Sequence, residues 1–278
     1  MKKPVAAISM YRNAPLFVDK WISYYAEQLG HENLYLFVDG LDQPLPKEAE
    51  KIHCFKIPHK SFSRAKGDRF RAKKISTFAQ SLFPKYSAVI AMDIDEFLVV
   101  DPKLGLGLKA YLQQHTAITS CSALGLDVGQ HPQGEKPIDL KKPFLTQRRF
   151  AQISDRYTKA VVSFEPLEWG SGFHRVKGKN FVIDPNLFLF HFGLVDYTTA
   201  ANKSKDMELN KSGWKGHFKR RMGLYEALEE ETPQEAAPLF LTATNYFTKK
   251  RRWLAWNKPA TLKGPSVIKI PKRFEKIV

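Results

Sequence analysis

AMDIDEFLVV, residues 91–100, sets three carboxylates within four positions of an otherwise apolar run. An unpaired carboxylate inside a protein is very costly, so Asp93, Asp95 and Glu96 need partners. If the strand continues through this stretch, Asp93 and Asp95 point to the same side, because side chains alternate with period two. Two carboxylates so placed predict a site for Mg²⁺ or Mn²⁺, which prefer oxygen ligands and commonly bridge to phosphates. The competing interpretation is an acidic turn or a helix N-terminus with Glu96 near the helix dipole.

The chain before this stretch alternates between strand and helix patterns. Strands are predicted at 4–10, 33–40, 51–58 and 86–100, and helices at 14–30 and 64–84. Such alternation predicts an α/β fold, Rossmann-like, with a mostly parallel central sheet flanked by helices. Ligands of open α/β sheets bind outside the carboxyl ends of the strands. Asp39, at a predicted strand end, should therefore face the same crevice as Asp93 and Asp95.

The pattern is less regular after residue 112. We expect a strand and turn at 117–129, a loop at 131–143, strands within 157–176 and 179–197, helix over 198–231, and then a basic tail. No internal repeat or linker is visible. The simplest prediction is a catalytic domain over 1–200 with a helical and basic extension, 201–278, packed on it.

Composition excludes several classes of protein. The 278 residues are 43% hydrophobic, which is typical of a globular chain and not of a disordered one. No apolar run approaches the roughly 20 residues that span a bilayer, and the apolar stretch at 4–10 is interpreted as a strand rather than part of a signal peptide. Two cysteines, Cys54 and Cys121, are too few for a disulfide framework, which favours a reducing, cytoplasmic setting.

The net charge of +16 predicts attraction to polyanions. Basic residues concentrate at 56–74 and again from 249 to 276. In KKRRWLAW, residues 249–256, four cations precede two tryptophans, a combination that suits the headgroup layer of an anionic membrane. This predicts a peripheral association with the inner face of the cytoplasmic membrane; the alternative is a solvated basic face. No motif for specific nucleic-acid binding accompanies the charge.

Several segments resemble the GT-A glycosyltransferases related to families 2 and 92. They are SMYRNAPLFVDKWISYYAEQLGHENLYLFVDG (9–40), DIDEF (93–97), GSGFHRV (170–176) and FLFHF (188–192). The resemblance covers about residues 5 to 200, with the later part matched loosely. Two departures stand out. Ala14 occupies the place of a glutamate in the first turn, and LDQP follows FVDG where Ser-x-Asp is common.

The resemblance implies a role for each matching residue. Asp93 and Asp95 would coordinate Mn²⁺ or Mg²⁺ and the diphosphate of a nucleotide sugar, most readily a UDP-sugar. Asp39 would contact the base or ribose, and Arg12 and Asn13 would line the nucleotide pocket. His191 would be a third metal ligand, with a core histidine as the alternative interpretation. His174 is the competing ligand, or a contact to the acceptor or to phosphate, with Arg175 beside it.

The implied reaction is an inverting sugar transfer in which a carboxylate deprotonates the acceptor hydroxyl. Candidate bases are Asp127, Asp155, Glu165 and Glu168, with Glu168 preferred and Asp127 second. Trp169 is expected to stack on a sugar. Lys66 and Arg69 would stabilise the departing diphosphate, or simply form a solvated helix face. The acceptor implied by the resemblance is a glycan or lipid-linked molecule of bacterial surface polysaccharide or lipopolysaccharide synthesis.

Two other functional classes stay open at this point. A metal-dependent phosphohydrolase or nucleotidyltransferase also needs carboxylates, a metal and phosphate. A nucleotidyltransferase would usually carry a glycine-rich loop near the first strand, and SMYRNAP (9–15) has none. The non-enzymatic alternative is a polyanion-binding protein that retains the fold.

Overall fold

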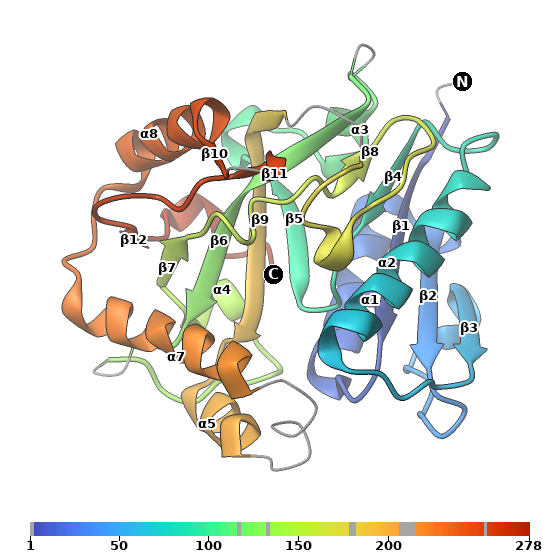
Figure 1. Ribbon diagram of the computed structural model, residues 1–278, viewed down its shortest axis with the longest axis horizontal. Helices are drawn as coiled ribbons and strands as arrows, with labels where there is room; N and C mark the ends of the chain where they lie inside the picture. The colour runs from blue at the N-terminus through green and yellow to red at the C-terminus, as the bar shows by residue number, and fades with distance from the viewer. Residues whose placement is uncertain (1–2, 116–117, 132–133, 178–181, 206–214, 253–254) are drawn as a thin grey trace.

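Four parallel strands form the N-terminal half of the sheet in the computed structural model, which describes residues 3–115, 118–131, 134–177, 182–205, 215–252 and 255–278 (Figure 1). They are β1 (Val5–Tyr11), β2 (Leu34–Asp39), β3 (His53–Ile57) and β4 (Ala88–Ala91). Their order is β3-β2-β1-β4, with every neighbouring pair parallel. This Rossmann-like half, with helices on its faces, confirms the predicted α/β class.

The two long helices of this half lie on opposite faces of the sheet. Helix α1 (Pro15–Leu29) starts with a proline at its first position and stops before Gly30, which has a φ of 92° that favours glycine. The buried residues of α1 pack on the face of β1 that carries Val5 and Ala7. Helix α2 (Arg64–Gln80) packs Ile75 and Ala79 on the opposite face. These two helices and the three upstream strands match the sequence-based prediction.

The C-terminal half extends the sheet with largely antiparallel strands. They are β5 (Glu96–Val100), β6 (Ser120–Gly129), β7 (Phe150–Ile153), β8 (Val162–Ser163), β9 (Ile183–Leu194) and β12 (Val267–Lys269). Strand β9 lies between β5, which is antiparallel to it, and β6, which is parallel. A separate hairpin pairs β10 (Arg251–Arg252) with β11 (Ala255–Pro259). The remaining short helices are α3 (Leu108–Leu112) and α4 (Phe144–Gln147), with 3-10 turns η1 (His31–Asn33), η2 (Ala49–Lys51), η3 (Pro102–Leu104), η4 (Ser171–Phe173) and η6 (Lys272–Phe274).

The continuous strand predicted over 86–100 is wrong. Strand β4 ends at Ala91, and β5 starts at Glu96 and pairs with β9 rather than with β1. A tight turn joins them, in which the amide of Glu96 donates to the carbonyl of Asp93 over 3.1 Å. Both aspartates therefore lie in a turn and not on alternate positions of one strand. The turn still lies at the carboxyl end of β4, where the acids were expected.

The segment after residue 197 contributes helices to both faces of the sheet. Helix α7 (Lys215–Glu230) falls within the helical stretch predicted over 198–231, and α5 (Tyr197–Lys205) starts one residue before it; residues 206–214 lie outside the described part. Helix α8 (Ala236–Lys249) was not predicted. Its buried Phe240, Ala243 and Phe247 form an apolar stripe at helical spacing, and Phe240 packs on Phe188 of β9.

The C-terminal residues are part of the sheet rather than a basic tail. Strand β12 pairs with β7, and Arg273 forms an ion pair of 2.7 Å with the buried Asp101. Ile268 and Phe274 are buried in the same core cluster as α1. The domain boundary at residue 200 stays a prediction. Among the described residues, no helix has the length and apolar character needed to cross a membrane.

Candidate functional site

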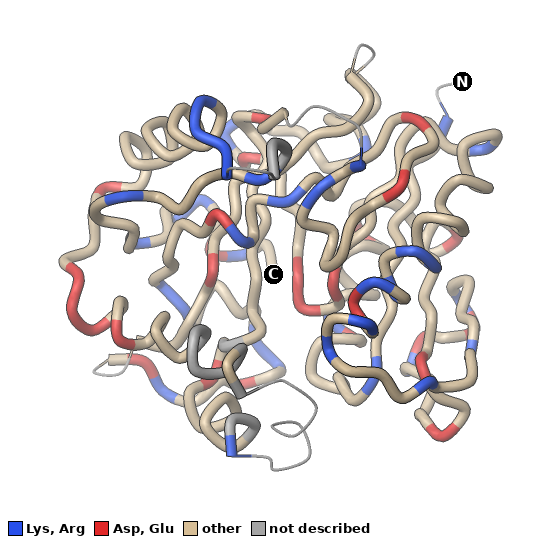
Figure 2. Tube along the Cα trace, viewed as in Figure 1, with Lys and Arg blue, Asp and Glu red and all other residues tan. Residues whose placement is uncertain are grey.

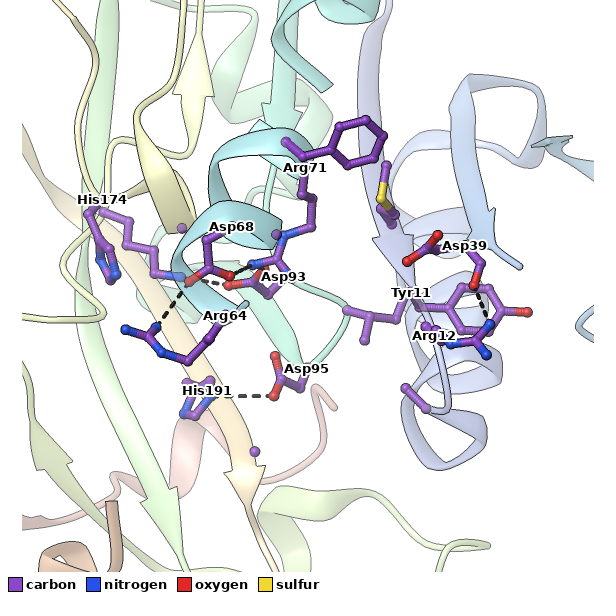
Figure 3. Close-up of a pocket in the computed structure, with 18 of the residues that line it drawn as sticks. Tyr11, Arg12, Asp39, Arg64, Asp68, Arg71, Asp93, Asp95, His174 and His191 are labelled. Atoms are coloured by element: carbon purple, nitrogen blue, oxygen red, sulfur yellow. Dashed lines mark hydrogen bonds and ion pairs between the residues drawn. The ribbon is translucent and has the colours of Figure 1, made fainter. Parts of the chain in front are cut away.

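A cavity of about 970 Å³ opens at the carboxyl ends of the parallel strands. The strand order reverses between β1 and β4, and ligands of doubly wound sheets bind at such a switch point. The cavity is lined by Tyr11 at the end of β1 and the two residues after it, by Asp39 at the end of β2, and by residues 93–95 after β4. Figure 3 shows them in two groups, with Tyr11, Arg12 and Asp39 apart from the cluster around Asp93.

One end of the cavity carries the residues predicted to hold a nucleoside. Arg12 donates to the carbonyl of Asp39 over 2.9 Å and pairs with Asp42, also at 2.9 Å. Asp39 Oδ2 lies 3.0 Å from His59 Nδ1, while its Oδ1 is buried with no hydrogen-bond partner in the described structure. A buried acceptor without a donor is costly, so this oxygen fits a hydroxyl or N–H group of a ligand.

Asn13 lies beside Arg12 with a φ of 52°, a left-handed conformation that asparagine tolerates better than most residues. Its amide donates to the side chain of Gln43 over 3.0 Å. Ala14 also lines the cavity. The methyl group at this position supplies no carboxylate where the resembling enzymes have one.

Asp93 faces two cations in the middle of the cavity. Its carboxylate lies 3.0 Å from Arg71 and 2.9 Å from the ammonium of Lys159. Burial alone would raise the pKa of Asp93, but Arg71 and then Lys159 outweigh it and hold that pKa below its ordinary value. Asp93 is therefore ionised at neutral pH.

Lys159 connects Asp93 to a second, fully buried carboxylate. Its ammonium lies 2.5 Å from Glu96, which has no exposed surface. Burial would lower the pKa of Lys159, but Asp93 and Glu96 raise it above the ordinary value, so the ammonium stays charged. Burial raises the pKa of Glu96 to about 7, against the lowering effect of Lys159. Asp93 in the turn and Glu96 at the start of β5 therefore share Lys159, a lysine from a distant segment, as their partner.

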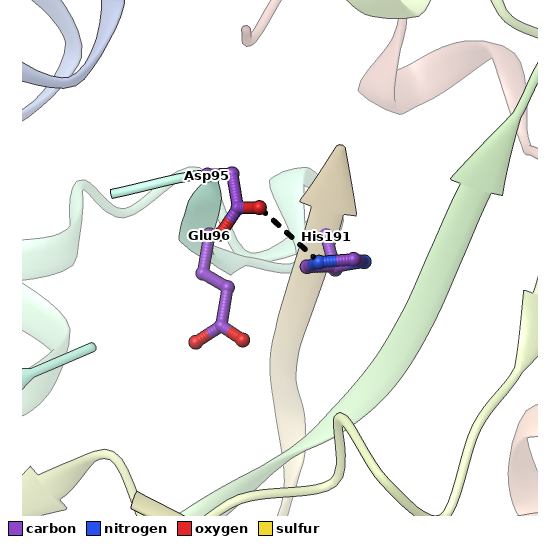
Figure 4. Close-up of side chains that lie close together, drawn as sticks. All are labelled: Asp95, Glu96 and His191. Atoms are coloured by element: carbon purple, nitrogen blue, oxygen red, sulfur yellow. Dashed lines mark ion pairs between the residues drawn. The ribbon is translucent and has the colours of Figure 1, made fainter. Parts of the chain in front are cut away.

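His191 connects the turn to strands β6 and β9. Its Nδ1 lies 2.6 Å from Asp127, its Nε2 lies 3.4 Å from Asp95, and its ring stacks on Tyr157 at 3.7 Å. Figure 4 shows the Asp95 carboxylate pointing at the imidazole ring. In a neutral imidazole whose Nδ1–H donates to Asp127, Nε2 presents its lone pair toward Asp95. Metal-binding histidines are usually oriented by a carboxylate in this way.

Asp95, Glu96 and His191 form a cluster that can hold a metal ion. Their ligand atoms all lie within 4.8 Å of one another. Two carboxylates and one imidazole suit Mn²⁺ or another divalent cation with mixed oxygen and nitrogen ligands. Two members of the predicted set, Asp95 and His191, belong to this cluster. The third, Asp93, lies in the same turn but is not part of this cluster, and it pairs with Arg71 and Lys159.

The other predicted site residues are distributed unevenly. Asp155 and His174 line the cavity, whereas Glu165, Glu168, Lys66 and Arg69 do not. Glu168 instead pairs with Lys177 at 2.6 Å on the surface. Trp169 is 1% exposed and donates its indole N–H to a backbone carbonyl, so the expected stacking of Trp169 on a sugar is wrong. Lys66 lies over the ring of Phe62, outside the cavity.

Helix α2 supplies the cavity residues that sequence reasoning missed. Arg64, Asp68 and Arg71 recur at helical spacing and point to one side. Asp68 pairs with Arg64 at 3.0 Å and with Arg71 at 3.1 Å. The helical spacing of these three residues is visible in the sequence. Lys66 and Arg69 are also basic but lie on the exposed side of the helix, so the sequence alone does not tell the two sides apart. Which basic face meets the acids depends on how α2 packs.

The C-terminal basic segment also reaches the cavity. Figure 2 shows basic residues on α2 and on the segment that follows α8. Arg252 pairs with Asp155 and lines the cavity together with Lys258. Residues 253–254 of the segment proposed to meet a membrane lie outside the described structure. The predicted membrane contact of residues 249–256 stays a prediction, and Arg252 already pairs with Asp155.

No protein-family model matches this chain, and no match is found among curated proteins. Solved structures similar to it include a mannosyltransferase from Pyrobaculum calidifontis in complex with GDP-mannose and Mn²⁺, at 12% identity, 82% coverage of this chain, 72% of that chain and a TM-score of 0.37. Another is mannose-1-phosphate geranyltransferase from Thermus thermophilus, at 12% identity, 83% and 69% coverage and a TM-score of 0.30. At these TM-scores neither likeness carries an argument about chemistry, and the resemblance to glycosyltransferases stays a prediction.

Proposed function

We propose that this protein is a divalent-metal-dependent glycosyltransferase that moves a sugar from a nucleotide-sugar donor to an acceptor hydroxyl. The observation that carries the proposal is His191, held by Asp127 at one nitrogen and facing Asp95 with the other inside the cavity. A carboxylate-oriented imidazole beside an acidic turn is the donor set of a metal site. Its place at the switch point of a parallel sheet favours a nucleotide as the metal's partner.

The metal would be held by Asp95 and His191, with Glu96 or Asp93 beside them. A bound Mn²⁺ or Mg²⁺ supplies Lewis-acid stabilisation of the negative charge on the leaving nucleoside diphosphate. The cations of α2 and Lys159 add electrostatic stabilisation from fixed positions, which costs no reorganisation during the reaction. Asp39 Oδ1, the buried acceptor at the other end of the cavity, would receive a hydrogen bond from the base or ribose.

Asp155 is the base that the cavity favours. Of the four candidate acids, it alone belongs to the described lining, where it pairs with Arg252. Asp127 contacts His191 Nδ1, so its proposed role is to orient the imidazole ring. In the proposed step, the acceptor oxygen attacks the anomeric carbon, its proton passes to Asp155, and the bond to the diphosphate breaks with inversion. The acceptor would be a glycan or lipid-linked hydroxyl, with a role in surface-glycan synthesis.

A donor panel tests this function. Incubation with UDP-glucose, UDP-galactose, UDP-N-acetylglucosamine and GDP-mannose should release free nucleoside diphosphate from one donor when Mn²⁺ is present and not in EDTA. The products also separate the alternatives. Sugar 1-phosphate would indicate a nucleotidyltransferase or pyrophosphatase, and inorganic phosphate a phosphohydrolase. Either product, or equal release in EDTA, would contradict the proposal.

A further inference from the structure

The cavity is more positive than a metal and diphosphate site alone requires. Its described lining includes eight Lys or Arg residues but five aspartates and no glutamate. Most of the cations are neutralised by carboxylates, in pairs such as Arg64 with Asp68, Lys159 with Asp93, and Arg252 with Asp155. Lys60, Arg156 and Lys258 are the lining cations without a carboxylate partner among the described residues, and the last two lie at the end of the cavity that carries Asp155.

Three cations at that end have no carboxylate partner within ion-pair distance among the described residues: Arg156, Arg175 and Lys258. Arg156 and Lys258 line the cavity. Arg175 lies near Lys258, and its stem packs on Gly170, where a Cβ atom would come within 2.9 Å of it. Burial lowers the pKa of Lys258, and Arg175, Arg252 and Lys159 lower it further. The described carboxylate that acts on Lys258 is Asp155, which already pairs with Arg252, so cations outnumber carboxylates at this end of the cavity.

The backbone beside these cations is held in an unusual conformation. Phe173 has a φ of 57° and follows Gly172, whose φ is 63°. A bulky residue in the left-handed region is strained, and such strain persists where packing imposes it and often marks functional sites. Phe173 is 1% exposed, so its buried ring anchors the turn. The turn places His174 in the cavity lining, and Arg175 follows it, near Lys258.

His174 is neutral in this field. Burial, and then Lys159 and Lys258, hold the pKa of His174 well below its ordinary value. Its Nδ1–H donates to the backbone carbonyl of Arg156 over 2.9 Å, which ties the turn to the segment that carries Arg156 and Asp155. This hydrogen bond joins the segments that carry Arg156 and Arg175, whereas Lys258 comes from β11, and the His174 ring itself adds no positive charge.

We propose that Arg156, Arg175 and Lys258 form a second anion subsite, which binds a phosphate group on the acceptor. Three unbalanced cations match a dianion with several oxygens better than a single carboxylate. The subsite lies beside Asp155, the proposed base, and at the opposite end from Asp39, where the nucleoside is expected. The assignment of this phosphate to an acceptor rests on the proposed function. The binding of phosphate itself depends only on the three cations. The enzyme would then select acceptors that carry a phosphate near the reacting hydroxyl.

Methyl phosphate is the probe for this subsite. Titrated into the protein saturated with Mg²⁺ and the nucleoside diphosphate, it should bind without displacing the nucleotide. Lys258→Gln should weaken its binding on the order of tenfold or more, because a charge-assisted contact is lost. Arg156→Gln should act in the same direction. Lys263→Gln removes an exposed cation of the same segment outside the cavity and should leave the affinity unchanged.

The outcomes separate the subsite from the proposed function. Competition between methyl phosphate and the nucleotide, or loss of nucleotide affinity in Lys258→Gln, would assign these cations to the donor and overturn the proposal. Equal binding by wild type and both variants would overturn it as well. If the nucleotide does not bind but methyl phosphate binds through Lys258, the subsite stands and the glycosyltransferase proposal fails. The melting temperature of Lys258→Gln should not fall, since the variant relieves repulsion among cations.

Discussion

Replacing Asp95 with asparagine should reduce sugar transfer on the order of a hundredfold or more while leaving the fold intact. The neutral amide is a poor ligand for a hard dication, and Asp95 is the member of the metal cluster that points at His191. The side chain is 22% exposed and lies in a turn, so the change leaves the core undisturbed. The measurement is the rate of nucleoside diphosphate release at saturating donor and Mn²⁺.

Two companion variants sharpen this test. Asp139→Asn, on the surface beside Lys142, should behave as wild type. Asp127→Ala leaves Asp95 in place but frees His191 Nδ1, so it should mainly raise the Mn²⁺ concentration needed for half-maximal rate. Turnover of Asp95→Asn close to that of Asp139→Asn would remove Asp95 from the site.

Replacing Lys159 with methionine should lower the free energy of unfolding by about 3–5 kcal/mol, because it leaves buried carboxylates without their partner. Lys159 is 2% exposed and contacts both Asp93 and Glu96. The matched control is Lys177→Met, which breaks the exposed pair with Glu168 and should cost less than about 1 kcal/mol. Urea unfolding of the two variants measures the difference, and equal midpoints would show that Lys159 does not stabilise the turn.

The cost of Lys159→Met should grow with pH. The pKa of Glu96 is already raised from 4.5 to about 7 in the native protein, so between these values the folded state binds more protons than the unfolded state. Stability linked to Glu96 therefore falls as pH rises through this window. Removal of Lys159 takes away a charge that lowers the Glu96 pKa, so at low pH the protonated acid should relieve much of the penalty.

Local signals were sufficient to predict the first half of the fold. Pro15 and Gly30 bound α1, and the apolar runs of β1 and β2 locate the parallel strands. The break after Ala91 could not be predicted in the same way. Glu96 lies beside His191 only because β5 pairs with β9, nearly a hundred residues away in the sequence. A long-range pairing leaves no local signature in an apolar stretch.

The site shows the same division between local and long-range information. The position of the three acids at the carboxyl end of a strand was predicted, but the turn that holds them was only the competing interpretation. The role of Asp127 was not predicted, since it depends on the register between β6 and β9 that sets Asp127 opposite His191. In the sequence, Lys159 is a single cation in a short apolar segment, with no sign of a partner. It pairs with two carboxylates only because that segment packs against the turn in the folded protein.

The measurement that tests the central claim most directly is a calorimetric titration of UDP and of GDP into the protein, first with Mn²⁺ and then with EDTA. The site of Asp95, Glu96 and His191 requires that metal and nucleoside diphosphate bind together. We therefore expect one nucleotide to bind tightly with Mn²⁺, and its affinity to fall on the order of tenfold or more in EDTA, as expected when a charge-stabilised contact to phosphate is lost. Equal affinity in Mn²⁺ and EDTA, or no binding of either nucleotide, would contradict a metal-dependent nucleotide-sugar site.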